Sequence, residues 1–183
     1  MAISVFIVLA EGFEEIEAVT PMDVLRRAGL DVTTVGLAGK TVAGSHGIAL
    51  TADRTWDEVA SLTPDLLLLP GGMPGSKNLG AHAGLKEMAK RLADSDRSIA
   101  AICAAPAFTL GDWGLLSGRK ATCYPGCETQ FPADVKFQAD PVVVDGRIIT
   151  SRGIGTAMEF SLRLVSLLLN QATADQLRTQ MLV

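Results

Sequence analysis

The stretch Ser98-Ile99-Ala100-Ala101-Ile102-Cys103-Ala104-Ala105-Pro106-Ala107 joins an unbroken apolar run to small residues that can start a helix. The apolar run has the length and character of a strand that is buried on both faces, as in a parallel sheet. A thiol at this junction lies at the carboxyl edge of the sheet, where the N–H groups of a following helix favour thiolate over thiol. Cys103 is therefore a candidate nucleophile. The alternative is a buried cysteine that behaves as a small hydrophobic residue.

Short apolar runs alternate with helical patterns along the rest of the chain. The runs predict strands at residues 3–10, 32–37, 65–69 and 98–102, possible short strands within 41–51, and an Asp-Gly hairpin over 142–150. Helices are expected at 14–28, 85–93 and 156–169, after Cys103, and near the C-terminus. This alternation predicts a mostly parallel sheet covered on both faces, and we expect one doubly wound α/β domain over residues 1–183.

Composition argues against several classes of protein. Of the 183 residues, 48% are hydrophobic and 20% are charged, which is typical of a globular chain. Sixteen basic residues against 20 acidic ones, without a basic cluster, argue against a nucleic-acid partner. No apolar segment approaches the roughly 18 residues of a membrane span, and the acidic stretch 11–17 argues against a signal peptide. Three irregularly spaced cysteines favour a reducing cytoplasm over a disulfide framework.

Three segments are expected to meet at the carboxyl edge of the sheet, where doubly wound folds bind ligands. They are residues 12–17, 70–75 and 103–105. Glu17 shares a helical stripe with positions 21, 24 and 28, so we expect it to be partly buried, with a raised pKa. It could then donate a hydrogen bond to a thiolate or act as a general acid/base. Glu14 and Glu15 are expected at the exposed start of the helix, where all three glutamates could simply complement its dipole.

Two glycine-containing turns resemble binding loops in composition. Gly71 and Gly72 follow a predicted strand and could supply backbone donors, or could simply allow an ordinary strand-end turn. The run 153–156 is too short for a dinucleotide fingerprint and is expected to be a cap or a tight packing turn before the long helix that follows it. Neither turn has the spacing of a nucleotide phosphate loop.

The remaining histidines and cysteines do not predict a metal site. His46 and His82 have no other ligand at metal-binding spacing in the sequence. Cys123 and Cys127 flank Tyr124-Pro125-Gly126, and the Pro-Gly pair interrupts any helix that would align them. A secondary redox role for these two thiols stays open.

Five motifs lie in order along nearly the whole chain. They are Ala10-Glu11-Gly12-Phe13-Glu14-Glu15-Ile16-Glu17, Asp23-Val24-Leu25-Arg26-Arg27-Ala28-Gly29, Leu69-Pro70-Gly71-Gly72, Ala100-Ala101-Ile102-Cys103-Ala104-Ala105-Pro106 and Thr150-Ser151-Arg152-Gly153. With these motifs the chain resembles the ThiJ/PfpI superfamily, in the branch of the Parkinson-disease protein deglycase and its bacterial relatives. The resemblance implies a flavodoxin-like sandwich of the class I glutamine amidotransferase type, usually a homodimer, that works without a cofactor.

The resemblance also implies roles for particular residues. Cys103 would be the reactive cysteine and Glu17 its hydrogen-bonding carboxylate, with an oxyanion pocket from backbone around Gly72 and Ala104. Gly71 and Tyr124 would lie against the substrate. Many members carry a histidine where this chain has Tyr124, and a phenol is neutral near pH 7 and cannot replace an imidazole as a base. The protease-like branch carries histidine at the position of Ala104, so a cysteine hydrolase or amidase is disfavoured.

Three functional hypotheses follow. The first is a cytoplasmic, homodimeric enzyme, a lyase or hydrolase, that acts on reactive α-oxoaldehydes or early glycation adducts, as a glyoxalase III or protein deglycase does. In it, Cys103 is the nucleophile and Glu17 carries the proton. The second is a redox-responsive stress protein or holdase that senses oxidation through Cys103, and a reactive thiolate suits both. The third is the disfavoured hydrolase. None requires a metal, nucleic acid or a membrane.

Overall fold

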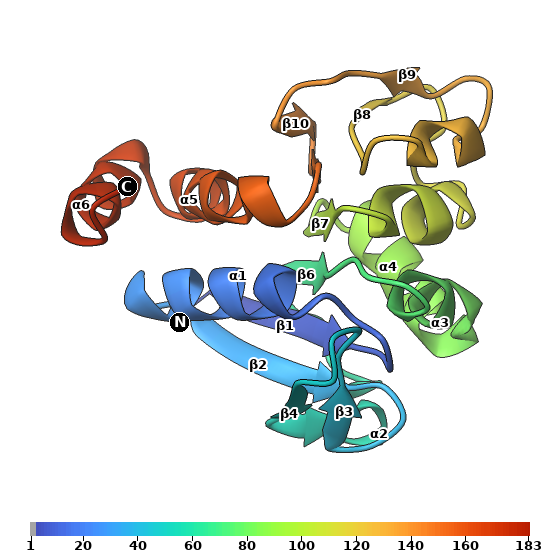
Figure 1. Ribbon diagram of the computed structural model, residues 1–183, viewed down its shortest axis with the longest axis horizontal. Coiled ribbons are helices and arrows are strands. Elements are labelled where there is room, and N and C mark those ends of the chain that lie inside the picture. The colour runs from blue at the N-terminus through green and yellow to red at the C-terminus, as the bar shows by residue number, and fades with distance from the viewer. Residues whose placement is uncertain (1–2) are drawn as a thin grey trace.

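A seven-stranded sheet of order β10-β11-β7-β6-β1-β2-β5 forms the centre of the computed structural model, which describes residues 3–183 (Figure 1). Met1 and Ala2 of the predicted domain lie outside the described residues. The strands are β1 (Ser4–Leu9), β2 (Asp31–Gly36), β5 (Arg54–Thr55), β6 (Leu66–Leu69), β7 (Ser98–Ile102), β10 (Val142–Asp145) and β11 (Ile148–Ser151). All neighbouring strands pair in parallel except β10 and β11, which form the predicted antiparallel hairpin.

Helices cover both faces of this sheet because successive strand residues point to opposite sides. In β6, Leu66 and Leu68 pack in one core, and Leu67 and Leu69 pack in the other. The first core is closed by α1 (Glu15–Arg27), α5 (Ala157–Leu168) and α6 (Gln171–Gln180). The second is closed by α2 (Trp56–Val59), α3 (Gly75–Ala81), α4 (Ala83–Asp94) and the π-helix η1 (Pro106–Gly111). The predicted doubly wound α/β architecture is therefore confirmed.

Smaller elements complete the structure around the edges of the sheet. Strands β3 (Thr41–Ala43) and β4 (Ala49–Thr51) form an antiparallel hairpin, as the sequence predicts for 41–51. Strands β8 (Lys120–Ala121) and β9 (Lys136–Phe137) pair in parallel and were not predicted, and neither was α3. The turns η2 (Cys127–Gln130) and η3 (Ile154–Thr156) are 3-10 helices. The second of these confirms the expected cap, because the Thr156 hydroxyl accepts a hydrogen bond from the Gly153 N–H at 3.1 Å.

The segment after Cys103 differs from the expected α-helix. The chain makes a turn at Cys103 and Ala104, and a single six-residue π-helix then begins at Pro106, directly after Ala105. So short a helix, with the wider hydrogen-bonding pattern of the π form, supplies little of the dipole that the sequence suggested for Cys103.

Among the described residues, no helix is both long enough and apolar enough to cross a lipid bilayer.

Candidate active site

The three segments expected at the carboxyl edge of the sheet do come together there, around a cavity of about 640 Å³. The β1–α1 turn, the β6–α3 turn and the turn after β7 each contribute to it, and two further walls come from the β3–β4 loop and from residues 124–127. The cavity is lined by Glu14, Glu17, Ser45, His46, Gly72, Met73, Cys103, Ala104, Phe108, Tyr124, Pro125, Cys127 and Ile154.

Cys103 occupies a strained turn directly after β7. Its φ angle is +67°, in the left-handed region that residues with a side chain rarely adopt. Two main-chain hydrogen bonds hold it there. The Cys103 N–H donates to the Ser151 carbonyl at 3.0 Å, and the Tyr124 N–H donates to the Cys103 carbonyl at 2.8 Å. The neighbouring segments therefore impose this conformation, which lifts the thiol off the strand and into the cavity.

Glu17 lies beneath Cys103 on the first turn of α1 and is 0% exposed, so the predicted burial is confirmed. Its Oε2 accepts a hydrogen bond from the Gly71 N–H at 3.0 Å. No described residue satisfies its Oε1. Burial raises the pKa of Glu17 to about 7, and the Glu14 carboxylate adds to that rise, while the Cys103 thiol and the Gly71 N–H act in the opposite direction.

The thiol does not have the lowered pKa that the sequence suggested. Burial and the charge of Glu17 raise the pKa of Cys103 to about 12, and they outweigh the N–H groups of Gly72 and Ala104, which lower it. Between pH values of about 7 and about 12, the Cys103–Glu17 pair therefore holds one proton. A thiolate can form at neutral pH when this proton moves to Glu17, without any loss of a proton to water.

Of the backbone N–H groups beside the thiol, one already donates to a carboxylate and two face the sulfur. The Gly71 N–H donates to Glu17, and the Gly71 carbonyl accepts from the Glu14 N–H at 2.9 Å. The N–H groups of Gly72 and Ala104 act on the Cys103 sulfur. A Cβ atom at position 71 would lie 2.5 Å from the Cβ of Cys103 and 2.5 Å from Glu17 Oε2, so only glycine fits between them.

Glu14 and Glu15 are buried, which contradicts the expectation of an exposed helix start. The loop between β3 and β4 folds over them and pairs with their carboxylates. The Oε1 of Glu15 accepts from the His46 N–H at 2.7 Å, and its Oε2 lies 2.9 Å from His46 Nδ1. Burial alone would raise the pKa of Glu15, but the hydrogen bonds from His46 dominate and lower it to about 2. The sequence has no local signal for this pairing because its partners lie 31 positions apart.

His46, Glu14 and Glu15 are also the one group of three potential metal ligands in the described part of the chain whose donor atoms lie within 4.8 Å of one another. Their polar atoms contact one another, with His46 Nδ1 at 3.2 Å from Glu14 Oε2 and at 2.9 Å from Glu15 Oε2. We therefore describe the group as an ion-pair cluster and assign no metal to it.

The segment with the two other cysteines forms the outer wall of the cavity. Tyr124 is half-exposed and Cys127 lines the same space, whereas Cys123 is fully buried beneath them. All three cysteines are free thiols, and burial raises the pKa of both Cys123 and Cys127. A redox role for these two residues stays a prediction.

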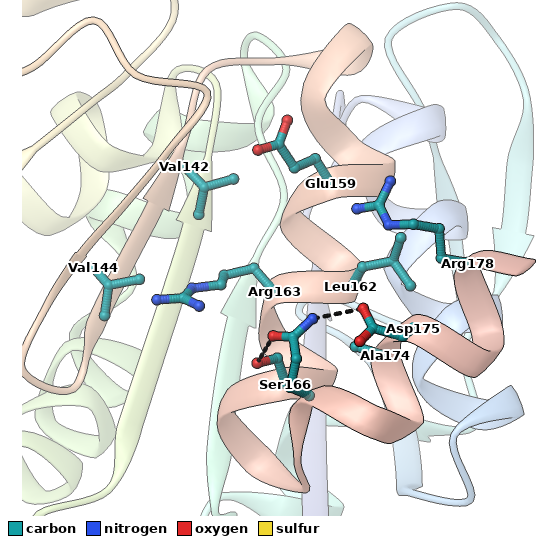
Figure 2. A pocket seen from close by; sticks show the side chains of 10 residues that line it. Val142, Val144, Glu159, Leu162, Arg163, Ser166, Ala174, Asp175 and Arg178 are labelled. Carbon is teal, nitrogen blue, oxygen red and sulfur yellow. Dashed lines mark hydrogen bonds between the residues drawn. The ribbon is translucent and has the colours of Figure 1, made fainter.

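A second cavity, of about 460 Å³, lies between β10 and the helices α5 and α6 (Figure 2). Three of its polar side chains are hydrogen-bonded to one another. Ser166 donates to Gln171 at 2.8 Å, and Gln171 donates to Asp175 at 2.8 Å. None of the described residues that line it is a cysteine or a histidine, so the cavity at Cys103 is the one suited to nucleophilic chemistry.

The chain is similar to known proteins over most of its length. The DJ-1/PfpI family matches residues 3–167. Protein DJ-1 homolog B of Arabidopsis thaliana is 44% identical over 93% of this chain, and the chain covers 39% of that protein's length. The glutathione-independent glyoxalase DJR-1.2 of Caenorhabditis elegans is 35% identical over 86% of this chain and 84% of its own. The structure of oxidized Toxoplasma gondii DJ-1 superposes with a TM-score of 0.95 at 40% identity and covers 99% of this chain and 98% of that one.

The overlap in length differs among these relatives. This chain spans less than half the length of Protein DJ-1 homologs A and B of Arabidopsis thaliana, at 46% and 39%. The superposition on solved DJ-1 structures extends over nearly the whole of both chains, and it confirms the expected flavodoxin-like fold of the class I glutamine amidotransferase type.

Proposed function

This chain belongs to the DJ-1/PfpI family, and on that premise we propose that it is a cysteine-dependent enzyme of the glyoxalase III type, which converts reactive α-oxoaldehydes to hydroxy acids without a cofactor. The observation that carries the proposal is the buried Cys103–Glu17 pair, which holds one proton at neutral pH beneath an open cavity. A relative named as a glyoxalase supports the same chemistry.

The first step is addition of the thiol to the aldehyde. As Cys103 Sγ bonds to the aldehyde carbon C1, the thiol proton moves to Glu17, and the C=O electrons move to the aldehyde oxygen O1. The N–H groups of Gly72 and Ala104, which act on the sulfur in the free protein, lie where they can donate to this oxyanion. Glu17 then protonates O1, which leaves a neutral hemithioacetal and a carboxylate.

The second step moves hydrogen between adjacent carbons. The Glu17 carboxylate removes the proton from C1, giving an enediolate whose charge lies on the ketone oxygen O2. The hydroxyl proton of O1 passes to O2, and Glu17 returns its proton to C2, giving a thioester of a 2-hydroxy acid. A pKa of about 7 suits this task, because the carboxyl can both take and give a proton near neutral pH. Water then hydrolyses the thioester and restores the Cys103 thiol. The sum is one α-oxoaldehyde and one water giving one 2-hydroxy acid.

The same hemithioacetal forms from early glycation adducts, in which the aldehyde carbon already carries an amine or thiol of another protein. Cys103 Sγ bonds to that carbon, the bond to the amine or thiol breaks, and the released group takes up the thiol proton. We include this deglycase activity in the proposal because the cavity opens to the surface at Tyr124, which is 50% exposed. The adduct carbon on a larger molecule could therefore reach Cys103.

We further propose that the protein works in the cytoplasm as a homodimer. Three free thiols are compatible with a reducing compartment. Two apolar side chains of α1, Ile16 and Val19, are exposed and give a second copy an apolar surface to cover. Light scattering coupled to size exclusion should give twice the mass of the chain, and Ile16→Glu should halve it.

The decisive experiment measures lactate formed from methylglyoxal by the wild-type protein and by Cys103→Ser. The wild type should form lactate without glutathione, and the variant should form none above the uncatalysed rate. Cys123→Ser is the matched control, because it removes a thiol that lies outside the cavity. If Cys103→Ser keeps full activity, the proposed function is wrong.

A second candidate, an oxidation-responsive stress protein or holdase, has one observation in its favour. The Oε1 of Glu17 has no partner among the described residues and lies in the same buried pair as the thiol. A protonated Glu17 could donate there to an oxygen of a Cys103 sulfinate and stabilise that oxidation step. Peroxide should then add two oxygen atoms to Cys103, and the oxidised protein should suppress aggregation of an unfolding client. If oxidation leaves client aggregation unchanged, this candidate falls.

A further inference from the structure

We propose that His46 is a second proton-transferring residue of this cavity, acting as a general acid on the ketone oxygen of the α-oxoaldehyde while Glu17 acts on the carbons. The inference rests on the proposed function and extends it. The position of His46 in the sequence suggests no role for it, because its polar partners lie at the start of α1, far away along the chain.

The imidazole of His46 lies in the wall of the cavity that holds Cys103 and Glu17. Its side chain is 68% exposed, so a ligand in the cavity can reach it. Its Nδ1 already has three polar neighbours, at 2.9 Å from Glu15, 3.2 Å from Glu14 and 3.1 Å from the Ser45 hydroxyl. The nitrogen left for a ligand is therefore Nε2.

The ring is oriented rather than mobile. The His46 N–H donates to Glu15 Oε1 at 2.7 Å, and the Ser45 N–H donates to the Phe13 carbonyl at 2.8 Å. The loop between β3 and β4 is thus fastened to the β1–α1 turn through both main chain and side chain. A carboxylate that binds one imidazole nitrogen fixes which nitrogen faces the substrate, as in carboxylate–histidine pairs of known active sites.

Charge in the cavity also singles out His46. The titratable groups around it are Glu14 and Glu15 beneath the ring, Glu17 and Cys103 at the base, and Tyr124 and Cys127 on the outer wall. Among the described residues that line the cavity, His46 alone can carry a positive charge. The hydrogen bond that His46 donates to Glu15 and the charges of Glu14 and Glu15 raise the pKa of His46, which favours the imidazolium near neutral pH.

An acid at this place can give a proton to O2 and take one from O1 in the second step. When Glu17 takes the proton from C1, negative charge develops on the ketone oxygen O2. The Nε2–H of His46 gives its proton to O2, so the enediol forms without charge. Glu17 then delivers its proton to C2, while the neutral imidazole takes the O1 hydroxyl proton. The thioester forms, and both His46 and Glu17 return to their starting states.

The test compares pH profiles of lactate formation from methylglyoxal. In the wild type, kcat should fall at low pH as Glu17 is protonated and at high pH as His46 loses its proton. His46→Gln should lower kcat at least 10-fold, change KM little, and remove the high-pH limb, since removal of a general acid typically costs ~10²–10⁴-fold. His46→Ala should regain activity when free imidazole is added.

The matched control is His82→Asn. His82 caps α4 by accepting a hydrogen bond from the Leu85 N–H at 3.1 Å and is absent from the cavity, and asparagine is also a good cap. This variant should keep the wild-type profile. If Cys103→Ser is inactive while His46→Gln keeps the wild-type kcat and both limbs, only the role of His46 is refuted. If Cys103→Ser retains activity, the proposed function fails and the role of His46 fails with it.

Discussion

Glu17 and Glu15 lie on the same helix turn, yet their ionisation should affect folding stability with opposite signs. The pKa of Glu17 rises from 4.5 to about 7 in the folded protein, whereas that of Glu15 falls from 4.5 to about 2. We predict that Glu17→Gln stabilises the protein at pH 8 and that Glu15→Gln destabilises it. The amide is nearly isosteric with the protonated acid, so the comparison isolates the charge.

The magnitude for Glu17 follows from linkage. Each pKa unit corresponds to about 1.4 kcal/mol, so the rise at Glu17 amounts to about 3 kcal/mol. Below pH 4.5, Glu17 is protonated in both folded and unfolded states and contributes nothing to the difference. As pH rises from 4.5 to about 7, the unfolded chain ionises more readily than the folded one, and stability is lost. Above pH 7 the full cost is present, and Glu17→Gln removes it.

For Glu15 the sign is reversed. Its lowered pKa contributes stability that is complete above pH 4.5 and is lost as pH falls towards 2. Glu15→Gln also weakens the charged hydrogen bonds that hold the 44–48 loop, which are worth roughly 1.5–3 kcal/mol. Its cost should be larger at pH 6 than at pH 8, because the positive charge of His46 is lost as pH rises, and it should shrink at pH 3.5.

The assay is urea unfolding at pH 3.5, 4.5, 6 and 8, with the free energy of unfolding compared between each variant and the wild type. Other carboxyls titrate equally in all three proteins and cancel. The advantage of Glu17→Gln should grow from near zero at pH 4.5 to about 3 kcal/mol at pH 8. A difference that does not change with pH would refute the assignment of Glu17 as the buried group that titrates near neutrality.

Three further predictions concern the turn at Cys103, the fit of Gly71 beside it, and the residue that transfers the proton. Cys103→Gly should be about 1 kcal/mol more stable than Cys103→Ala in urea unfolding, because only glycine adopts a φ of +67° without strain. Equal stabilities of the two variants would mean that the turn is not strained. Gly71→Ala should lose about 1–3 kcal/mol in the same assay through overpacking, whereas Gly155→Ala, which meets nothing within 4 Å, should be neutral. Tyr124→Phe should lower kcat for methylglyoxal at most about 5-fold, the worth of one neutral hydrogen bond, while Glu17→Gln lowers it ~10²–10⁴-fold; the reverse order would assign the proton transfer to the tyrosine.

The sequence by itself determined the architecture, because the interactions that specify it are local. Short unbroken apolar runs favour buried strands, and their alternation with helical patterns predicts a doubly wound sheet. Connection rules then bring the turns after β1, β6 and β7 to one edge, which singled out Cys103 and Glu17 before any contact was known. The helical stripe of Glu17 also predicted its burial correctly.

The chemical state of the site was decided only by the tertiary structure. The pKa of Cys103 depends on how much water its neighbours exclude and on the charge of Glu17, and neither can be read from the residues beside it in the chain. The strained turn depends on Ser151 and Tyr124, which lie far along the sequence. Likewise His46 joins Glu15 across 31 positions, and that loop buries two glutamates that local pattern placed in solvent. Desolvation and pairing between distant segments arise only when the whole chain has packed, so local periodicity cannot encode them.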